Sequence, residues 1–307
     1  GTMGQTRNLT DWTLFAALTT LWASAYAFTR LAVNPTDPAS GIPPEFIIPM
    51  RLTGGAGILL LIAFLSGQKW PALSDWRNWL IIAIMGLFGT AMPFFLITTA
   101  QQTVDSSLAA LYVSAAPLFV SIAAHFVFHD DTMNARKAFG IAVGFIGVAV
   151  LFGPEAIAAF GSASVTAQAM CLLATAFYAL STIIARYGRD IPPFVFSAGF
   201  VTFGAIATLP FLAFVDYSTL APSSSAVIGV VGLAIAPTAM ASFLYLMLVK
   251  RTSATFVSLT GYAIPILSAI IGFFAFREVQ SWNAILAFAL ILSGVWLAQR
   301  GGAAAKA

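Results

Sequence analysis

Hydroxyl-bearing and aromatic side chains recur at helical spacing in long apolar segments of this sequence. Thr19, Trp22 and Tyr26 share a face of the first segment, and Thr175 and Tyr178 share a face of a later one. Hydroxyls can hydrogen-bond the charged ends of a zwitterion, while aromatic rings stack on its side chain or attract its ammonium group. The spacing predicts a site for a small molecule with both polar and apolar parts.

Other apolar segments also carry hydroxyl-bearing and aromatic side chains along one face, and Gln101 follows one of these segments. Serine and threonine in membrane helices also bond their own backbone, and aromatic residues also face lipid, so a structural role stays open for each residue. The predicted substrate-binding set is Trp22, Tyr26, Thr90, Phe94, Ser114, Tyr178, Thr238, Ser242, Tyr245, Ser258 and Tyr262.

Two prolines, Pro117 and Pro265, lie near the middle of long apolar segments. A proline inside a helix frees the carbonyl four residues earlier, here that of Val113 and of Gly261. In lipid, such a carbonyl must face protein or a wet cavity. We therefore expect both prolines beside the site, as helix kinks with a gating role or as kinks that only shape packing.

Few charged groups are expected at membrane depth. His125 is interpreted as the only titratable side chain well inside an apolar segment, where it is either proton-linked or an interfacial histidine bonded to a neighbouring helix. Arg30 and Arg51 fall near the ends of their segments. We interpret them as headgroup anchors in preference to gate residues.

All 11 acidic residues are expected at helix ends or in loops: Asp11, Asp37, Glu45, Asp75, Asp105, Asp130, Asp131, Glu155, Asp190, Asp216 and Glu278. An ionisable group at the bilayer centre is costly and is kept for function. The pattern therefore predicts no proton antiport through a membrane carboxylate and a substrate without large net charge, such as a zwitterion with an apolar or aromatic side chain.

The composition identifies the environment of these segments. The chain has 307 residues, of which 60% are hydrophobic and 8% charged, and its mean hydropathy is +0.92. Because soluble domains carry about 25% charged residues, a soluble enzyme is excluded and most of the surface must face lipid. The basic residues are scattered, so no nucleic-acid partner is expected. One cysteine and two histidines predict no metal site, and no cofactor is expected.

Ten segments have the length of a membrane helix. They are Asp11–Leu31, Glu45–Ser66, Trp79–Thr98, Ser107–Phe128, Arg136–Phe152, Ser164–Arg186, Pro193–Phe214, Ala226–Val249, Thr255–Phe276 and Trp282–Gln299. With the N-terminus in the cytoplasm, only Arg30, Arg51 and Arg277 lie outside, and the other lysines and arginines lie inside. Positively charged loops stay cytoplasmic, which predicts that both termini are cytoplasmic.

An internal repeat relates the two halves of the chain. At an offset of 148 residues, Thr90-Ala91-Met92 recurs as Thr238-Ala239-Met240, and Pro117 falls on Pro265. Each half, residues 11–153 and 164–299, holds five predicted helices. Because five is odd, the second half enters the membrane from the opposite side. The predicted fold is an all-α integral membrane protein of ten transmembrane helices in two inverted five-helix repeats.

Inverted repeats are typical of secondary transporters, although an ancestral duplication without transport is the alternative. Trp22 followed by Arg30, the paired prolines and the five-plus-five architecture resemble the drug/metabolite transporter superfamily of EamA type, over the whole chain. Within it, the chain is similar to the YddG aromatic amino acid exporters. The resemblance implies a bacterial inner-membrane exporter that works by alternating access. Its central cavity would be lined mainly by helices one, three, four, six, eight and nine, with helices five and ten peripheral.

The expected substrate is thus a zwitterionic amino acid, and the alternative is a broad exporter of amphipathic drugs or metabolites. An intramembrane enzyme is a remote alternative, because Asp130-Asp131 reads as a solvated loop and Ser121 with His125 lacks a nucleophile motif. We expect a monomer in the lipid bilayer. The G-x-x-x-G spacing of Gly140 and Gly144 fits either packing within the chain or a dimer face.

Overall fold

The computed structural model describes residues 8–128, 133–153, 162–252 and 254–304, and all regular secondary structure in these ranges is helical. The first half contains α1 (Leu9–Val33), η1 (Pro38–Ser40), α2 (Pro44–Ser66), α3 (Trp76–Gly86), η2 (Leu87–Ala91), α4 (Met92–Ala100), α5 (Ser106–Val113), α6 (Ala116–Val127) and α7 (Ala135–Phe152). The second contains α9 (Ala163–Ala185), η3 (Arg186–Gly188), α10 (Pro193–Thr208), η4 (Leu209–Phe214), α11 (Ser224–Leu233), η5 (Ala234–Met240), α12 (Ala241–Arg251), α13 (Ala254–Ser258), α14 (Thr260–Phe276) and α15 (Trp282–Ala304).

Helices long enough to cross a membrane make up nearly all of the molecule. Among the described residues, nine helical segments have the length and apolar character of a membrane span. The remaining long helix, α1, has 25 residues but is more polar, since it carries several hydroxyls together with Asp11 and Arg30. It packs against α11, α12 and α14 inside the bundle. The predicted all-α, multi-pass membrane fold is confirmed.

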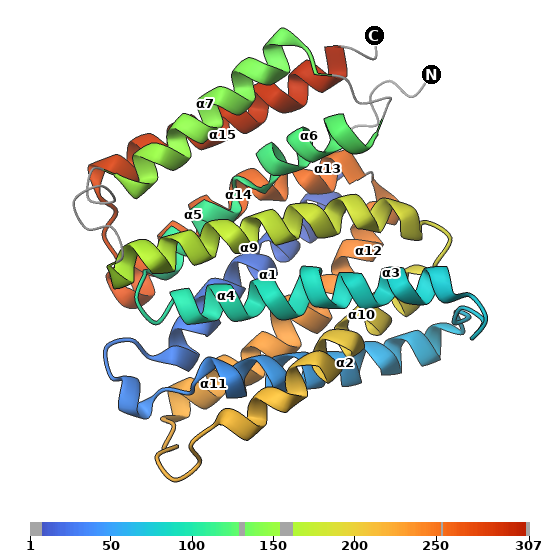
Figure 1. Ribbon diagram of the computed structural model, residues 1–307, viewed down its shortest axis with the longest axis vertical. Coiled ribbons are helices and arrows are strands. Elements are labelled where there is room, and N and C mark those ends of the chain that lie inside the picture. Colours follow the sequence, from blue (N-terminus) through green and yellow to red (C-terminus); the bar gives the residue numbers. More distant parts are fainter. Residues whose placement is uncertain (1–7, 129–132, 154–161, 253, 305–307) are drawn as a thin grey trace.

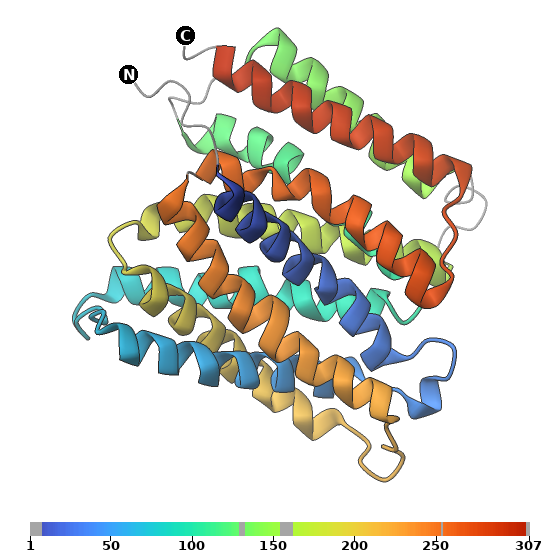
Figure 2. The same cartoon turned by 180° about the vertical axis from the view of Figure 1, so that it is seen from behind.

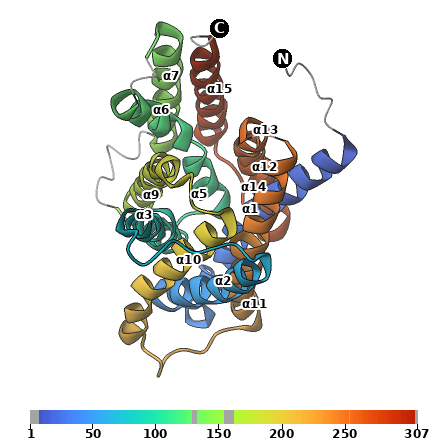
Figure 3. The same ribbon diagram turned by 90° about the vertical axis from the view of Figure 1, so that its right-hand side faces the viewer.

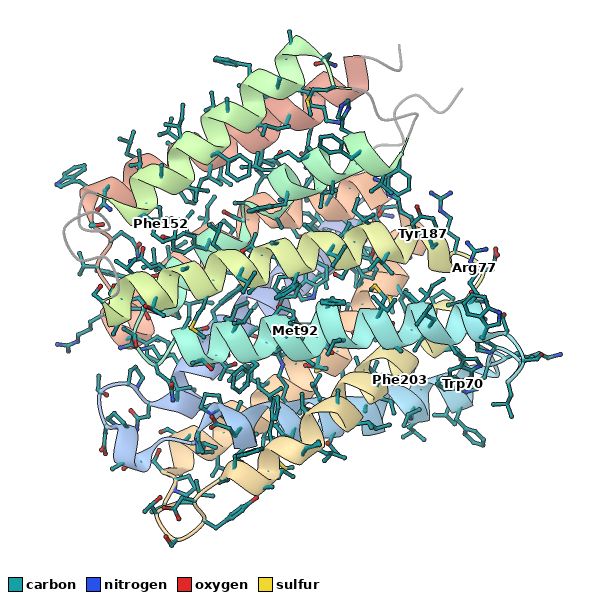
Figure 4. The ribbon with its side chains drawn as sticks, in the orientation of Figure 1. Trp70, Arg77, Met92, Phe152, Tyr187 and Phe203 are labelled. Atoms are coloured by element: carbon teal, nitrogen blue, oxygen red, sulfur yellow. The ribbon has the colours of Figure 1, made fainter. Side chains whose placement is uncertain are left out.

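The helices lie side by side and alternate in direction (Figure 1). The start of α1 and the end of α15 lie at the same end of the bundle, as Figure 2 also shows from behind. Figure 3 shows α7 and α15 together at one edge, with α2 and α11 at the other. In Figure 4, Trp70, Arg77 and Tyr187 lie at one end of the molecule and Phe152 at the opposite end.

Helix contacts follow the predicted repeat. In one set, α1 packs against α11, η5 and α12; in the equivalent set, α9 packs against α3, η2 and α4. Likewise α2 contacts η5 and α11, while α10 contacts η2 and α3, and α2 packs directly on α10. These contacts between the halves therefore occur in pairs in which the roles of the halves are exchanged, as an inverted repeat predicts.

Two π-helical segments, η2 and η5, occupy equivalent positions in the repeats. Met92, which follows η2, lies midway between the ends of the molecule (Figure 4). Next to them, a Cβ atom on Gly204 would clash with Thr90, and a Cβ atom on Gly55 would clash with Thr238. Glycine thus lets α10 and α2 approach the π-helical turns closely. π-helical turns inside α-helices often lie at functional sites.

The paired prolines differ in their local structure. Pro117 stands in the first turn of α6, after a break at Ser114 and Ala115. Pro265 lies inside α14, whose preceding break is at Leu259. The prediction of equivalent kinks is therefore wrong in detail, because helix four is interrupted three residues before its proline and helix nine six residues before its own.

The G-x-x-x-G motif packs α7 against α15. A Cβ atom on Gly140 would lie 2.5 Å from the backbone nitrogen of Ala298, and one on Gly294 would clash with the backbone of Gly144. These glycines allow the two helices to touch through their backbones. The motif thus joins the first half to the second within one chain.

Candidate binding cavity

A cavity of about 400 Å³ lies in the centre of the bundle between the two halves. Its volume falls within the range of about 300–1,000 Å³ that small-molecule sites occupy. The lining residues come from helical crossings one to four and six to nine, and none comes from α7 or α15. All six helices expected to form most of the lining contribute to it. Arg51 of α2 and Phe200 and Val201 of α10 also line the cavity, because these helices pack closely on the π-helical turns.

Most of the predicted site residues come together in this cavity. Those in its lining are Trp22, Tyr26, Thr90, Phe94, Ser114, Tyr178, Thr238, Ser242 and Pro265. Val113 and Gly261, whose carbonyls the prolines free, also line it. The structure thus places the two proline-containing regions at the cavity, as the need to satisfy their backbone requires.

Tyr245 is not among the lining residues. Its side chain is 38% exposed, and its ring packs on Trp22 at a centroid distance of 5.7 Å. Ser242, which follows η5, lines the cavity as predicted, whereas Tyr245 lies further along α12, where its ring meets Trp22. Tyr245 therefore supports Trp22 from outside the cavity.

Ser258 and Tyr262 are also absent from the lining. Ser258 is exposed at the end of α13, and the Tyr262 hydroxyl donates a hydrogen bond to Gln299 Oε1 on α15. The predicted stripe required one continuous helix through both residues. Because the helix breaks at Leu259, the cavity receives Gly261, Ile264 and Pro265 in its place.

Pro117 and His125 do not line the cavity. Pro117 directs α6 away after the break at Ser114. His125 is exposed near the end of α6, where its Nδ1 accepts a hydrogen bond of 3.2 Å from the backbone nitrogen of Met133. The neighbouring residues 129–132 lie outside the described residues. The interfacial interpretation of His125 thus agrees with its exposed position.

The aromatic residues form one connected part of the cavity surface. Phe94 and Tyr178 make an edge-to-face contact with centroids 6.5 Å apart, and Trp22, Tyr26 and Phe200 add further rings. Aromatic surfaces of this kind bind apolar and aromatic side chains. The ring faces also attract ammonium groups.

The hydroxyl groups of the cavity have a fixed hydrogen-bonding direction. Thr90 donates to the carbonyl of Gly86, Ser114 to that of Leu111, and Ser242 to that of Thr238. Donation to their own helix leaves oxygen lone pairs for a ligand. In this arrangement the hydroxyl oxygens can accept hydrogen bonds from an ammonium group.

Gln101 adds an unsatisfied acceptor to the lining. Its amide nitrogen donates to the carbonyl of Tyr26 at 2.9 Å, while its Oε1 atom is buried and has no hydrogen-bond partner in the described part of the chain. Buried polar atoms are normally paired. Because the oxygen is buried, a molecule in the cavity would reach it only if the Gln101 side chain moved.

Arg51 is a cavity residue that sequence reasoning misplaced. It was interpreted as a headgroup anchor, but it is only 6% exposed and lines the cavity. Its Nε donates to Thr238 Oγ1 at 3.1 Å, and its guanidinium lies 3.7 Å from the ring centroid of Phe94. The expectation of a cavity without charge is wrong, because α2 turns this face inward. In the sequence, Arg51 follows Pro44, Ile47 and Ile48 at a spacing of one helical turn. This spacing could have indicated that Arg51 lies on the buried face of its helix.

Arg30 was likewise misplaced as a headgroup anchor. Its side chain is 15% exposed and forms ion pairs with Glu278 at 3.2 Å and Asp105 at 3.3 Å. The Glu278 side chain is 1% exposed and accepts hydrogen bonds from the backbone nitrogens and hydroxyls of Ser106 and Ser107. The network joins α1, α5 and the connection to α15 just beyond the cavity residues Thr29 and Gln101. Glu278 lies just after the end of α14, as expected, but it is a buried carboxylate.

Asp105 is the less buried carboxylate of this network. Burial and the neighbouring Glu278 raise its pKa, and the attraction of Arg30 lowers it by less than the other two effects raise it. Arg30 thus compensates two carboxylates at once. Glu278, unlike Asp105, also accepts the hydrogen bonds of Ser106 and Ser107.

A helical bundle in two inverted halves, with a central cavity between them, defines a membrane transporter for small molecules. The model of the EamA-like transporter family matches this chain twice, over residues 11–153 and 165–299. The chain belongs to the EamA-like transporter family, within the drug/metabolite transporter superfamily.

Known proteins agree with this assignment along the whole chain. YdfC of Bacillus subtilis (strain 168), described as an uncharacterized transporter, is 28% identical over 281 residues, which cover 90% of this chain and 86% of YdfC. YedA of Escherichia coli (strain K12), described as an uncharacterized inner membrane transporter, is 26% identical over 290 residues, 93% of this chain and 89% of YedA. A crystal structure of another protein aligns with 98% of this chain and 100% of its own, with a TM-score of 0.64 and 21% identity, and supports the fold alone.

Proposed function

We propose that this transporter exports aromatic and other apolar amino acids across the bacterial inner membrane by alternating access. The observation that carries the proposal is the aromatic central cavity between the repeats, formed in part by Trp22, Phe94, Tyr178 and Phe200. The rings match an apolar side chain in chemistry, and the cavity is large enough for a small molecule.

The polar groups of the cavity favour an amino acid over a purely apolar molecule. The hydroxyl oxygens are acceptors for an ammonium group, and Arg51 supplies positive charge. Both ends of a zwitterion thus find complementary groups. No aspartate or glutamate is among the lining residues, which favours export without proton coupling through a membrane carboxylate.

Alternating access is supported by the two inverted halves, residues 11–153 and 164–299. Two nearly equivalent halves can exchange inward-facing and outward-facing arrangements at similar energy. The Arg30–Glu278 network ties helices from both halves together at one end of the cavity. The distribution of basic residues supports cytoplasmic termini, and with that orientation this end faces the periplasm.

Flux through proteoliposomes tests the proposal. Vesicles loaded with labelled phenylalanine, tryptophan, methionine, alanine or glutamate are compared with and without a pH gradient. We expect selective movement of the large apolar amino acids that the gradient does not change. Movement of amphipathic drugs or metabolites without amino acids would favour the alternative substrate class, and glutamate moving as fast as phenylalanine would contradict the proposal.

A matched pair of tyrosines links that flux to the cavity. Tyr178→Ala removes a ring from the cavity, whereas Tyr187→Ala changes an exposed tyrosine near the end of the same helical crossing. Because only the first variant removes a ring from the cavity, we expect its phenylalanine transport to fall on the order of tenfold. The Tyr187 variant should transport normally. Equal activity in the two variants would place the substrate elsewhere.

A further inference from the structure

Arg51 places a buried positive charge in the cavity without a carboxylate partner. None of the ion pairs found in the described ranges includes Arg51, although Arg30 and Arg251 both pair with acids. A charged group removed from water is costly unless it is paired and hydrogen-bonded. Membrane proteins keep such a group mainly for function.

The contacts of Arg51 orient its guanidinium and leave much of it available. The Nε atom donates to Thr238 Oγ1, and Thr238 in turn donates to the carbonyl of Leu233 at 2.9 Å. Phe94 covers one face of the guanidinium. No hydrogen bond from the two terminal nitrogens is found among the described residues. These nitrogens are the donors that bind a carboxylate in the bidentate manner.

A purely structural role does not account for this arrangement. Stacking on a phenylalanine and one neutral hydrogen bond compensate only part of the cost of burying an arginine. In the second repeat, no arginine stands at the position equivalent to Arg51. There Gly204 packs on Thr90 as Gly55 packs on Thr238, and Phe200 takes the position of Arg51, four residues before the glycine.

The repeats therefore differ in charge at equivalent positions of the cavity. Both Arg51 and Phe200 line it, so one wall is cationic and its counterpart is apolar. A substrate with an anionic group at one end and an apolar group at the other would bind in a single orientation. A symmetric apolar cavity would not provide this selection.

We propose that Arg51 binds the carboxylate of the transported molecule through its terminal guanidinium nitrogens and thereby selects carboxylate-bearing substrates. This inference rests on the proposed amino acid export and specifies which group of the substrate the transporter recognises. Arg51 is a binding residue, and Thr238 and Phe94 position it.

Binding of a matched series of compounds to the purified full chain tests the proposal. The series is phenylalanine, 3-phenylpropionate, which lacks the amine, and phenethylamine, which lacks the carboxylate. Because a charge-assisted bidentate contact is lost, we expect phenethylamine to bind the wild type about tenfold or more weakly than phenylalanine. This comparison needs no variant, so it is independent of any folding defect.

Substitutions then assign the effect to Arg51. Arg51→Gln should weaken phenylalanine and 3-phenylpropionate about tenfold or more while leaving phenethylamine unchanged, so the preference for carboxylates disappears. Arg51→Lys keeps the charge without the planar fork and should fall between the two. Arg77→Gln, which removes an exposed arginine at the start of α3, should match the wild type.

The possible failures are distinguishable. If phenylalanine binds, but phenethylamine binds equally well and Arg51→Gln has no effect, the carboxylate proposal is overturned and amino acid export stands. If the wild type moves no amino acid, the proposed function fails. In that case 3-phenylpropionate alone decides the inference: binding that depends on Arg51 supports it, and absence of binding overturns it.

Discussion

The hydrogen-bonding direction of single side chains determines what the cavity can bind. Thr90, Ser114 and Ser242 donate to carbonyls of their own helices, so they offer acceptors to a ligand. Arg51 offers donors. A zwitterionic amino acid requires both, because its ammonium group only donates hydrogen bonds and its carboxylate only accepts them. At the residue scale, the cavity therefore discriminates by charge as well as by size.

Gly261 offers a direct test of cavity size. A Cβ atom at this position would meet no other heavy atom within 4 Å, apart from its own helix, and the residue lines the cavity. Gly261→Leu should therefore fold normally and fill cavity space. Because a pocket discriminates by about 10–200-fold per methylene, we expect tryptophan transport to fall about tenfold relative to alanine transport.

The control for this variant is Gly57→Leu, whose side chain would extend from the exposed face of α2 and meets no atom there. It should leave the tryptophan-to-alanine ratio unchanged. If Gly261→Leu also leaves that ratio unchanged while the protein remains folded, the aromatic side chain does not occupy the region beside α14.

At the scale of helices, close backbone packing fixes the arrangement around the cavity. α7 and α15 touch through glycines at one edge and contribute nothing to the lining. The π-helical turns of η2 and η5 present Thr90 and Thr238 to glycines of α10 and α2. The peripheral pair therefore has a packing role, and the central helices hold the binding groups.

Gly294→Ala tests the packing of that pair. The added methyl group would clash with the backbone of Gly140 and Gly144, which cannot move as a flexible side chain can. Overpacking of this kind costs about 1–3 kcal/mol. We expect a lower melting temperature in detergent, with transport per folded molecule retained. A melting temperature equal to that of the wild type would refute the backbone contact.

Gly57→Ala is the matched change for this measurement. Alanine is preferred over glycine within a helix by about 1 kcal/mol, and the exposed site has room for the methyl group. Its melting temperature should equal or exceed that of the wild type. A melting temperature that falls in Gly294→Ala but not in Gly57→Ala would separate the effect of packing from that of helix propensity.

For the whole molecule, orientation in the membrane decides which end of the cavity the Arg30–Glu278 network occupies. Ser74, between α2 and α3, and Ser218, between η4 and α11, are both exposed and lie in connections at opposite ends of the bundle (Figure 1). The proposed topology places Ser74 in the cytoplasm and Ser218 in the periplasm. A thiol reagent that cannot cross membranes distinguishes them.

In spheroplasts, Ser218→Cys should be labelled directly, whereas Ser74→Cys should be labelled only after the membrane is opened. The native Cys171 is buried and should give little background in either case. Because basic loops remain in the cytoplasm, the excess of lysine and arginine near Ser74 is the physical reason for this expectation. The reverse labelling pattern would invert the proposed transport direction.

The sequence alone determined the fold of this protein and much of its site. Long apolar segments can satisfy their backbone in lipid only as helices, so the helical crossings followed from composition and length. The offset repeat implied inverted halves, and polar residues at helical spacing indicated Tyr26, Thr90, Tyr178 and Thr238. These inferences depend on local periodicity and on the cost of exposing polar groups to lipid.

Only the tertiary structure decided which helix faces meet. The break at Leu259 moves Ser258 and Tyr262 off the predicted face, and Tyr245 packs on Trp22 outside the cavity lining. Arg51 and Glu278 looked like residues of helix ends because distance along the chain does not reveal what packs beside them. Their burial arises from neighbours distant in sequence, and the charge of the cavity therefore became visible only in the folded molecule.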